Sequence, residues 1–220
     1  SDVCSSDLSD IICFNGTATL VPKRAILNLP AALRQIGAGG GLGAELAASA
    51  PADGHTIWMG QTNNLAIGPA MRKKNPYDSL RDFSTITLLM KAPQIMVVVA
   101  GSPITSVKDL IAAAKKSPGT LTFASAGIGS SGHICGELFN QATGVNMVHV
   151  PYKGVGAALT DLLSGQIQMS ILSGGSVYGQ VRAQKLRALA VASTARVKAA
   201  PDLPTMIEAG VPGYLVTQWH

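Results

Sequence analysis

The stretch Leu121–His133 decides the fold, and its sequence is Leu-Thr-Phe-Ala-Ser-Ala-Gly-Ile-Gly-Ser-Ser-Gly-His. The first four residues predict a strand, and the small residues 125–132 predict a turn that leads into a helix beginning at His133. Such a turn directs several unpaired backbone N–H groups of the helix N-terminus toward one point, where the helix dipole also favours negative charge. The stretch therefore predicts an anion-binding site.

The glycines of this turn also match the dinucleotide-binding pattern Gly-x-Gly-x-x-Gly, because they stand at Gly127, Gly129 and Gly132. That pattern needs an acidic residue about 20 positions after the last glycine, to bind the ribose hydroxyls. Counting from Gly132 leads to Tyr152, which is followed by Lys153. Lys153 could hold the 2′-phosphate of NADP, so an NADP-type dinucleotide-binding enzyme stays open as an alternative.

Composition narrows the class of protein. Hydrophobic residues make up 47% of the 220 residues and charged residues 13%, yet no apolar run approaches the roughly 18 residues of a membrane span. The net charge is +5, but the seventeen Lys and Arg residues are scattered and only 5% of residues are aromatic. We therefore expect a globular α/β protein that binds no nucleic acid.

Beyond Gly101, a candidate domain junction, predicted helices and strands alternate. Strands are expected at Leu121–Ala124, Val145–Val150, Ile167–Leu172 and Arg187–Val191, and helices at Val107–Lys116, from His133 to Gly144, at Val155–Leu163 and at Val177–Gln184. Strands separated by single helices form right-handed βαβ units of a parallel sheet. The turns after the strands should therefore share one edge, where Lys153 is the only cation and no carboxylate is expected, which suits anion binding without acid–base chemistry.

The segment before this junction has a less regular pattern. A short helix is expected at Ala44–Ala50 and another at Leu65–Met71, with strands at Thr56–Met59, Thr85–Leu89 and Ile95–Ala100. The loop Gly60–Asn64 follows a predicted strand, and ligands of open α/β sheets bind at such loops. Thr62 and Asn63 are therefore candidate ligand donors, although they could equally cap the helix that follows.

No catalytic or metal-binding constellation is predicted. Ser130, Ser131 and His133 are adjacent, but they lack a Gly-x-Ser-x-Gly elbow and their hydroxyls suit helix capping. Glu137 and His133 are four residues apart, without a third metal ligand of suitable spacing. The cysteines are three in number, and Cys135 is expected as a buried free thiol. We expect no cofactor.

Ordered motifs along residues 37–219 resemble the Bug family, the periplasmic substrate-binding proteins of tripartite tricarboxylate transporters. The motifs are Gly37-Ala38-Gly39-Gly40, Pro51-Ala52-Asp53-Gly54-His55-Thr56, Asn75-Pro76-Tyr77-Asp78, Ala124-Ser125-Ala126-Gly127, Val148-His149-Val150-Pro151-Tyr152-Lys153-Gly154, Leu159-Thr160-Asp161-Leu162-Leu163-Ser164-Gly165-Gln166 and Pro201-Asp202-Leu203-Pro204-Thr205. The resemblance implies a type II periplasmic-binding-protein fold, a Venus flytrap of two α/β domains, with the first domain incomplete. It also implies a periplasmic, monomeric, non-enzymatic protein that captures a small carboxylate and delivers it to the membrane subunits of the transporter.

The family holds its ligand between two loops, largely through backbone N–H groups and bridging waters. The residues at the matching positions are Gln61, Thr62, Asn63, Ser125, Ala126, Gly127, Gly129, Ser130, Ser131, His133, Tyr152, Lys153, Gly154 and Ser173. Many members have an acidic residue near Ser173 that could pair with the ammonium of an amino acid, and its absence favours a plain carboxylate. A flytrap that senses a ligand for a signalling protein remains a further alternative.

The resemblance divides the chain into four segments. Residues 1–36 are atypical for the family, residues 37–100 belong to domain 1, residues 101–216 form domain 2, and residues 217–220 begin the return to domain 1. The closing hinge is expected near Gly101 and Thr217. No export signal is visible at the start of the chain. We expect the chain to be a fragment, with weak stability and poor ligand binding.

Overall fold

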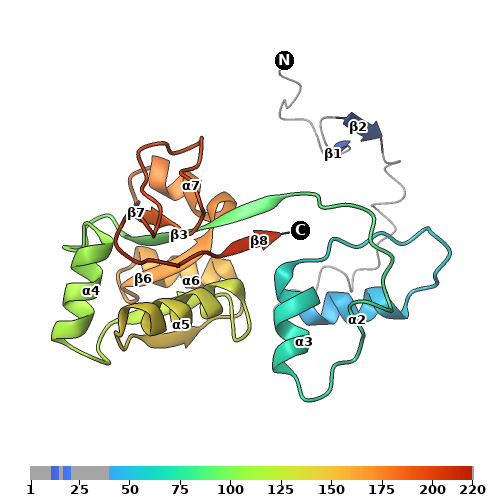
Figure 1. Ribbon diagram of the computed structural model, residues 1–220, viewed down its shortest axis with the longest axis horizontal. Helices are drawn as coiled ribbons and strands as arrows, with labels where there is room; N and C mark the ends of the chain where they lie inside the picture. The colour runs from blue at the N-terminus through green and yellow to red at the C-terminus, as the bar shows by residue number, and fades with distance from the viewer. Residues whose placement is uncertain (1–10, 15–16, 21–39, 220) are drawn as a thin grey trace.

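The computed structural model describes residues 11–14, 17–20 and 40–219 (Figure 1). Strands β1 (Ile11–Phe14) and β2 (Thr17–Leu20) form an antiparallel pair. The other residues of 1–39, including Gly37, Ala38 and Gly39 of the first family motif, lie outside the described residues. No helix in the described part of the chain is both long and apolar enough to cross a membrane.

A six-stranded sheet forms the centre of the second half of the chain. Its strands are β3 (Lys91–Val99), β4 (Thr122–Ser125), β5 (Val148–Pro151), β6 (Met169–Ser173), β7 (Leu186–Val191) and β8 (Thr217–Trp219). Their order is β5-β4-β6-β3-β7, with β8 paired to the start of β3. Strand β4 is parallel to β5 and β6, whereas β3 is antiparallel to β6, β7 and β8.

The fully parallel sheet predicted from the alternating pattern is therefore wrong at one strand, β3. Because β3 is antiparallel to both of its neighbours β6 and β7, these two strands still run in the direction of β4 and β5. Their carboxyl ends meet at one edge, as predicted. Strand β3 precedes the βαβ units in the chain and is not one of their strands. The pattern of the βαβ units therefore does not predict the position of β3 in the sheet.

Four helices cover this sheet, α4 (Val107–Lys116), α5 (Ser131–Thr143), α6 (Val155–Leu163) and α7 (Gly174–Arg182). The predicted bounds of α4 and α6 are confirmed. The Ser106 hydroxyl caps α4 by accepting a hydrogen bond from the Asp109 N–H, and Gly144 ends α5 in a left-handed conformation with φ of 65°. Helix α7 begins three residues earlier than predicted, directly after β6.

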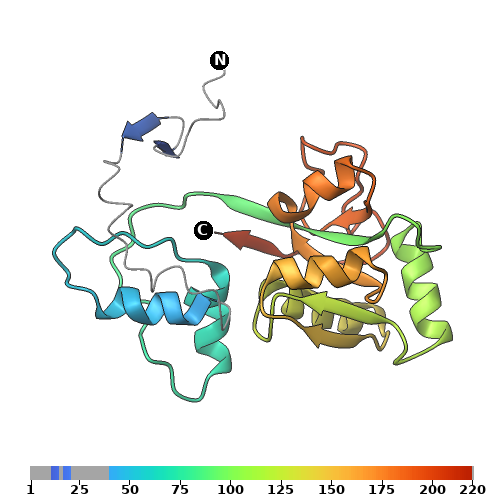
Figure 2. The ribbon, with the colours of Figure 1, turned by 180° about the vertical axis from the view of Figure 1, so that it is seen from behind.

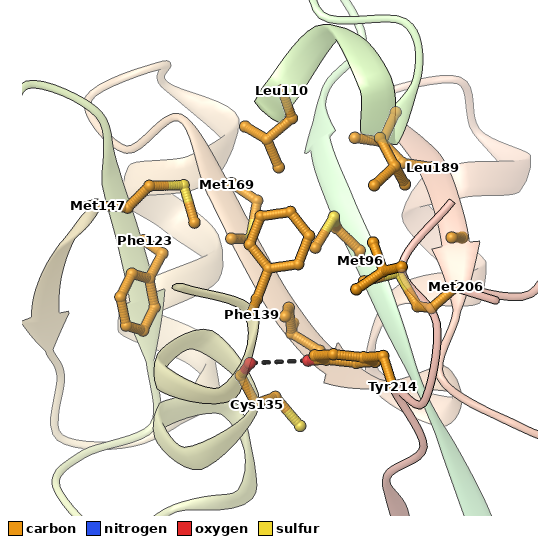
Figure 3. Close-up of a cluster of buried hydrophobic side chains, with 14 of the residues drawn as sticks. Met96, Leu110, Phe123, Cys135, Phe139, Met147, Met169, Leu189, Met206 and Tyr214 are labelled. Atoms are coloured by element: carbon orange, nitrogen blue, oxygen red, sulfur yellow. Dashed lines mark hydrogen bonds between the residues drawn. The ribbon is translucent and has the colours of Figure 1, made fainter. Parts of the chain in front are cut away.

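The core lies on both faces of the sheet. Along β3, Met96 and Val98 point into a cluster with α4 and α5, whereas Ile95 and Val97 point into a cluster with α6 and α7. Figure 3 shows the first cluster, in which the Tyr214 hydroxyl donates a 2.7 Å hydrogen bond to the Cys135 carbonyl. Burial raises the pKa of the Cys135 thiol to about 12, so the prediction of a buried free thiol is confirmed.

The first half contains short helices joined by irregular segments. These helices are α2 (Gly41–Ser49), the π-helical turn η3 (Asn63–Ile67) and α3 (Gly68–Met71). The strands predicted at Thr56–Met59 and Thr85–Leu89 are wrong, because neither segment has a ladder partner among the described residues. A strand needs a neighbour for its backbone groups, which the local sequence does not specify.

Two strand segments connect the halves. Lys91–Pro93 of β3 pair with Thr217–Trp219 of β8, and Figures 1 and 2 show both segments running between the sheet and the first half. Gly101, near which one hinge was expected, lies beyond the opposite end of β3. Residues 94–99, on the first-domain side of the predicted boundary, bond into the sheet of β6 and β7. The division into domains remains a prediction. The pairing of residues 94–99 with β6 and β7 favours a domain boundary near residue 93 rather than residue 100.

Candidate ligand-binding site

The candidate site lies at the edge where β4, β5 and β6 end. Helices α5, α6 and α7 each begin within a few residues of these strand ends, at Ser131, Val155 and Gly174. Their N-terminal N–H groups and dipoles therefore face the same edge and favour an anion there. The predicted turn residues of the second half are brought together by this arrangement.

The turn after β4 is shaped by its own hydrogen bonds. The Ser125 hydroxyl accepts a 3.1 Å hydrogen bond from the Gly127 N–H, and the Ser130 N–H donates to the Gly127 carbonyl at 3.1 Å. Gly127 and Gly129 have φ values of 129° and 78°, a region that side chains strongly disfavour. A Cβ on Gly132 would lie 2.7 Å from the Ile171 carbonyl oxygen. Turn geometry and close packing of α5 on β6 thus explain the glycine spacing without a dinucleotide.

The first turn of α5 leaves donors free. The Ser130 hydroxyl caps the helix by accepting from the His133 N–H at 3.4 Å. The N–H groups of Ser131 and Gly132 donate no hydrogen bond within the described part of the chain. These two adjacent donors, at the positive end of a 13-residue helix, are suited to the two oxygens of a carboxylate.

Two stacked imidazoles support this turn. The Gly129 N–H donates to His133 Nδ1 at 3.2 Å, so a neutral His133 carries its proton on Nε2. The ring of His149 stacks on His133 at 4.1 Å and on Phe123 at 4.9 Å. Burial, with His133 adding to it, lowers the pKa of His149 to about 4, so this imidazole is neutral at physiological pH. Sequence reasoning did not place His149 in the site, although it is a polar residue inside an apolar strand and stands in the family motif Val148–Gly154.

Ser125 and His149 form a close pair, with Oγ and Nε2 2.6 Å apart. A serine beside a histidine is the arrangement of an activated nucleophile. Ser125 is fully buried, however, and its hydroxyl is occupied by Gly127. The pair fixes the end of β4 and the start of the turn, and it gives a substrate no access to the hydroxyl.

The turn after β5 contributes backbone and one cation. The Tyr152 N–H donates to the Ser125 carbonyl at 3.0 Å, and the Gly154 N–H donates to the Ala126 carbonyl at 3.2 Å. The Tyr152 hydroxyl donates to Asp161 at 2.6 Å, and this carboxylate raises the pKa of Tyr152 to about 12. The hydroxyl is thus occupied on α6, whereas Lys153 is exposed beside the edge.

The turn after β6 carries the remaining predicted residue of the second half. Ser173 occupies the N-cap position of α7 in an extended conformation without a side-chain capping bond, and its hydroxyl lies 3.0 Å from that of Ser176. Both hydroxyls are neutral, so this turn adds no charge to the edge.

The loop Gly60–Asn64 of the first half approaches the same edge through β8. The Trp219 N–H donates to Thr62 Oγ1 at 3.0 Å, and the Gln218 amide donates to Gln61 Oε1 at 3.4 Å. The side-chain oxygen of Asn63 is buried and has no partner within the described residues. The two predicted loops therefore both lie beside β8.

Two glutamines that sequence reasoning missed join these loops. Gln218 Oε1 accepts from Gln94 Nε2 at 2.9 Å and from the Ser131 hydroxyl at 3.3 Å. Gln94 is fully buried on β3, and Gln218 is 7% exposed on β8. The local sequence does not predict this contact, because Gln94 and Gln218 are 124 residues apart and meet only where β8 pairs with β3.

Two other features of the structure were considered as ligand or metal sites, and neither lies at the edge where β4, β5 and β6 end. A cavity of about 780 Å³ lies between α7, β7 and residues 199–209, away from the turns, and its walls are mostly apolar. Among the described residues, no three or more His, Cys, Asp and Glu side chains are grouped as metal ligands.

Comparison with known proteins places this geometry in a family. Residues 30–220 match the model of the tripartite tricarboxylate transporter family receptor. The chain belongs to this receptor family. A structure of the periplasmic binding protein BugD is 34% identical to this chain, with a TM-score of 0.78 over 84% of this chain and 61% of that one. The predicted membership of the Bug family and the predicted type II periplasmic-binding-protein fold are therefore confirmed.

Two further relatives are informative. A Rhodopseudomonas palustris structure with adipate is 35% identical, with a TM-score of 0.79 over 82% of this chain and 60% of that one. A UPF0065 protein from Pseudomonas sp. (strain P51), in the tcbD-tcbE intergenic region, is 40% identical over 83% of this chain and 54% of that protein. The chain spans about half the length of the curated relatives it matches.

Proposed function

We propose that this chain acts as a monomeric solute-binding receptor in the periplasm, which captures a small organic carboxylate and delivers it to the membrane subunits of a tripartite tricarboxylate transporter. The observation that carries the proposal is the pair of free N–H donors at Ser131 and Gly132, opposite a loop that is bonded to the same strand, β8. Family membership and the adipate in a related structure support the same conclusion.

The binding step follows from this geometry. One ligand carboxylate accepts hydrogen bonds from the first turn of α5, where the helix dipole adds favourable electrostatic energy of about 0.3–1 kcal/mol. The exposed ammonium of Lys153 attracts the anion toward the edge. The loop Gly60–Asn64 then contacts the far end of the ligand when the halves rotate about Lys91–Pro93 and Thr217–Trp219.

The turn after β6 bears on the kind of carboxylate. Ser173 and Ser176 offer hydroxyls and no negative charge. An ammonium group would find no counter-ion there, and burying an unpaired charge is costly. We therefore propose a plain di- or tricarboxylate rather than an amino acid.

Isothermal titration calorimetry of the 220-residue chain tests the proposal. We expect heat of binding for at least one of succinate, adipate and citrate up to millimolar concentration, and none for glutamate or NADPH. Binding of NADPH with no response to any organic acid would overturn the proposal in favour of the dinucleotide alternative.

Lys153→Ala sharpens this test. We expect the dissociation constant to rise about 2- to 5-fold, with the difference shrinking at high salt, because an exposed charge contributes about 1 kcal/mol or less. Lys198→Ala removes another exposed lysine of the second half and serves as the matched control. Equal effects of the two substitutions would show that only net charge matters.

A further inference from the structure

We propose that Gln218 is a positioning residue that couples the two loops of the carboxylate clamp, so that occupancy of one loop is transmitted to the other. This inference rests on the proposed function. Gln218 lies on β8, and its side-chain amide bonds to a residue from each of three elements: Gln94 of β3, Ser131 of α5 and Gln61 of the first-half loop.

The first step of the argument concerns Ser131. Its hydroxyl donates to Gln218 Oε1 at 3.3 Å, and its N–H is one of the two free donors of the anion site. A carboxylate bound at the α5 N-terminus is a stronger acceptor than an amide oxygen. The Ser131 hydroxyl therefore turns from Gln218 to the ligand when the site fills.

The second step concerns the remaining bonds of Gln218. Its Oε1 keeps the shorter 2.9 Å hydrogen bond from Gln94, while its Nε2 holds Gln61 at the longer distance of 3.4 Å. Release of Ser131 frees the amide of Gln218 to move toward the loop Gly60–Asn64 and shorten that contact. The same loop is held by Trp219 through Thr62, so it follows the strand.

A buried unsatisfied atom supports two arrangements of this network. Gln94 is fully buried, yet its Oε1 has no hydrogen-bond partner within the described residues. Orphaned buried acceptors are rare because desolvation without a partner is unfavourable. If the side-chain amides of Gln94 and Gln218 both turn over, Gln218 Nε2 donates to this oxygen and no longer to Gln61. The network thus has a second arrangement, in which Gln218 does not hold the loop Gly60–Asn64.

Hydrogen–deuterium exchange of the free 220-residue chain tests the coupling without any ligand. In Gln218→Ala we expect faster exchange in both segments, residues 61–66 and residues 129–134, by at least 5-fold. Gln141→Ala is the control, because Gln141 is an exposed glutamine of α5 whose side chain makes no hydrogen bond in the described part. Faster exchange in one segment alone, or in neither, would overturn the proposal.

Ligand binding supplies the readout that a purely structural role would leave unmoved. Gln218→Glu keeps the acceptor for Gln94 and Ser131 but loses the donor to Gln61 and, when ionised, places a negative charge beside the anion site. We expect its dissociation constant for the best-binding carboxylate to exceed that of the unmodified chain at least 10-fold at pH 8, and less than 3-fold at pH 5, where the new carboxyl is partly protonated. Because the new charge alone also gives a pH dependence, the coupling is measured by exchange with the ligand bound. Saturating carboxylate should slow exchange at residues 61–66 in the unmodified chain but not in Gln218→Glu, and equal slowing in both would contradict the coupling.

The two proposals fail in different ways. If the unmodified chain binds no carboxylate, the proposed function is wrong, and the exchange experiment still decides whether Gln218 couples the loops. If Gln218→Ala does not fold, Gln218→Glu removes only the donor to Gln61. Faster exchange is then expected at residues 61–66 and not at residues 129–134, and unchanged exchange at residues 61–66 would overturn the proposal.

Discussion

The two halves of the chain differ in how much apolar surface they bury. Nine of the thirteen exposed large hydrophobic side chains in the described part lie in residues 42–90, whereas nearly all buried hydrophobic residues lie after residue 94. Between residues 40 and 90, which the structure describes, only Ala44 and Tyr77 are buried hydrophobic residues. The second half therefore has its own hydrophobic core, and the described segments of the first half depend on local turns and on contacts with β8.

This difference matters for the candidate site. The anion-binding turn stands on a packed sheet, which fixes its N–H donors before a ligand arrives. The facing loop is held inside the first half by the buried Asn64, whose carbonyl accepts from the Tyr77 hydroxyl, and it contacts β8 through Gln61 and Thr62. One side of the clamp is preorganised, and the other is adjustable.

The largest expected effect comes from emptying the core of the second half. Phe139 is fully buried against Tyr214, and Phe139→Ala should lower the free energy of unfolding by about 3–5 kcal/mol. Leu80 is 95% exposed in the first half, and Leu80→Ala should change it by less than about 0.5 kcal/mol. Urea denaturation followed by circular dichroism measures both. Similar losses for the two variants would show that the comparison between the halves is wrong.

Substitutions of two helix glycines, Gly136 and Gly156, should change the free energy of unfolding by smaller amounts and in opposite directions. A Cβ on Gly136 of α5 would lie 2.1 Å from the Phe123 ring, so Gly136→Ala should cost about 1–3 kcal/mol of unfolding free energy. A Cβ on Gly156 of α6 meets nothing within 4 Å, and Gly156→Ala should add up to about 1 kcal/mol. Thermal unfolding of the two variants compares them directly, and a gain for Gly136→Ala would contradict the packing of α5 on β4.

The smallest effect is the pH dependence that His149 brings to the second half. Its folded-state pKa of about 4 lies below the ordinary value of 6.5, so between these values the unfolded chain binds the extra proton. Stability from this group is complete above pH 6.5 and is lost as the pH falls toward 4. We expect about 1–2 kcal/mol, because the ring is only partly buried and solvent screens its charge.

His149→Gln isolates this contribution, since glutamine can still bond to Ser125 and does not titrate. The unfolding free energies of the variant and the unmodified chain, measured between pH 7 and pH 4, should converge as the pH falls. Parallel curves would show that His149 is not held neutral by its surroundings.

The sequence predicted the second half well because its signals are local. The Ser106 cap of α4 and the left-handed Gly144 that ends α5 lie next to the helices that they bound, and the alternation of strands and helices placed the turns on one edge. The insertion of β3 and the meeting of Gln94 with Gln218 depend on pairings between distant segments, which no local pattern specifies. The two segments of the first half that were wrongly predicted as strands, Thr56–Met59 and Thr85–Leu89, contain residues that favour strands but have no neighbouring strand among the described residues.

The central claim is that a carboxylate binds at the first turn of α5 and engages the facing loop. The most direct measurement is a ¹H–¹⁵N NMR titration of the 220-residue chain with adipate or citrate. The account predicts saturable shifts of the Ser131 and Gly132 amide signals, with matching shifts at Thr62 and Asn63. Saturable shifts confined to residues outside these two loops, or no shifts with any carboxylate at millimolar concentration, would contradict it.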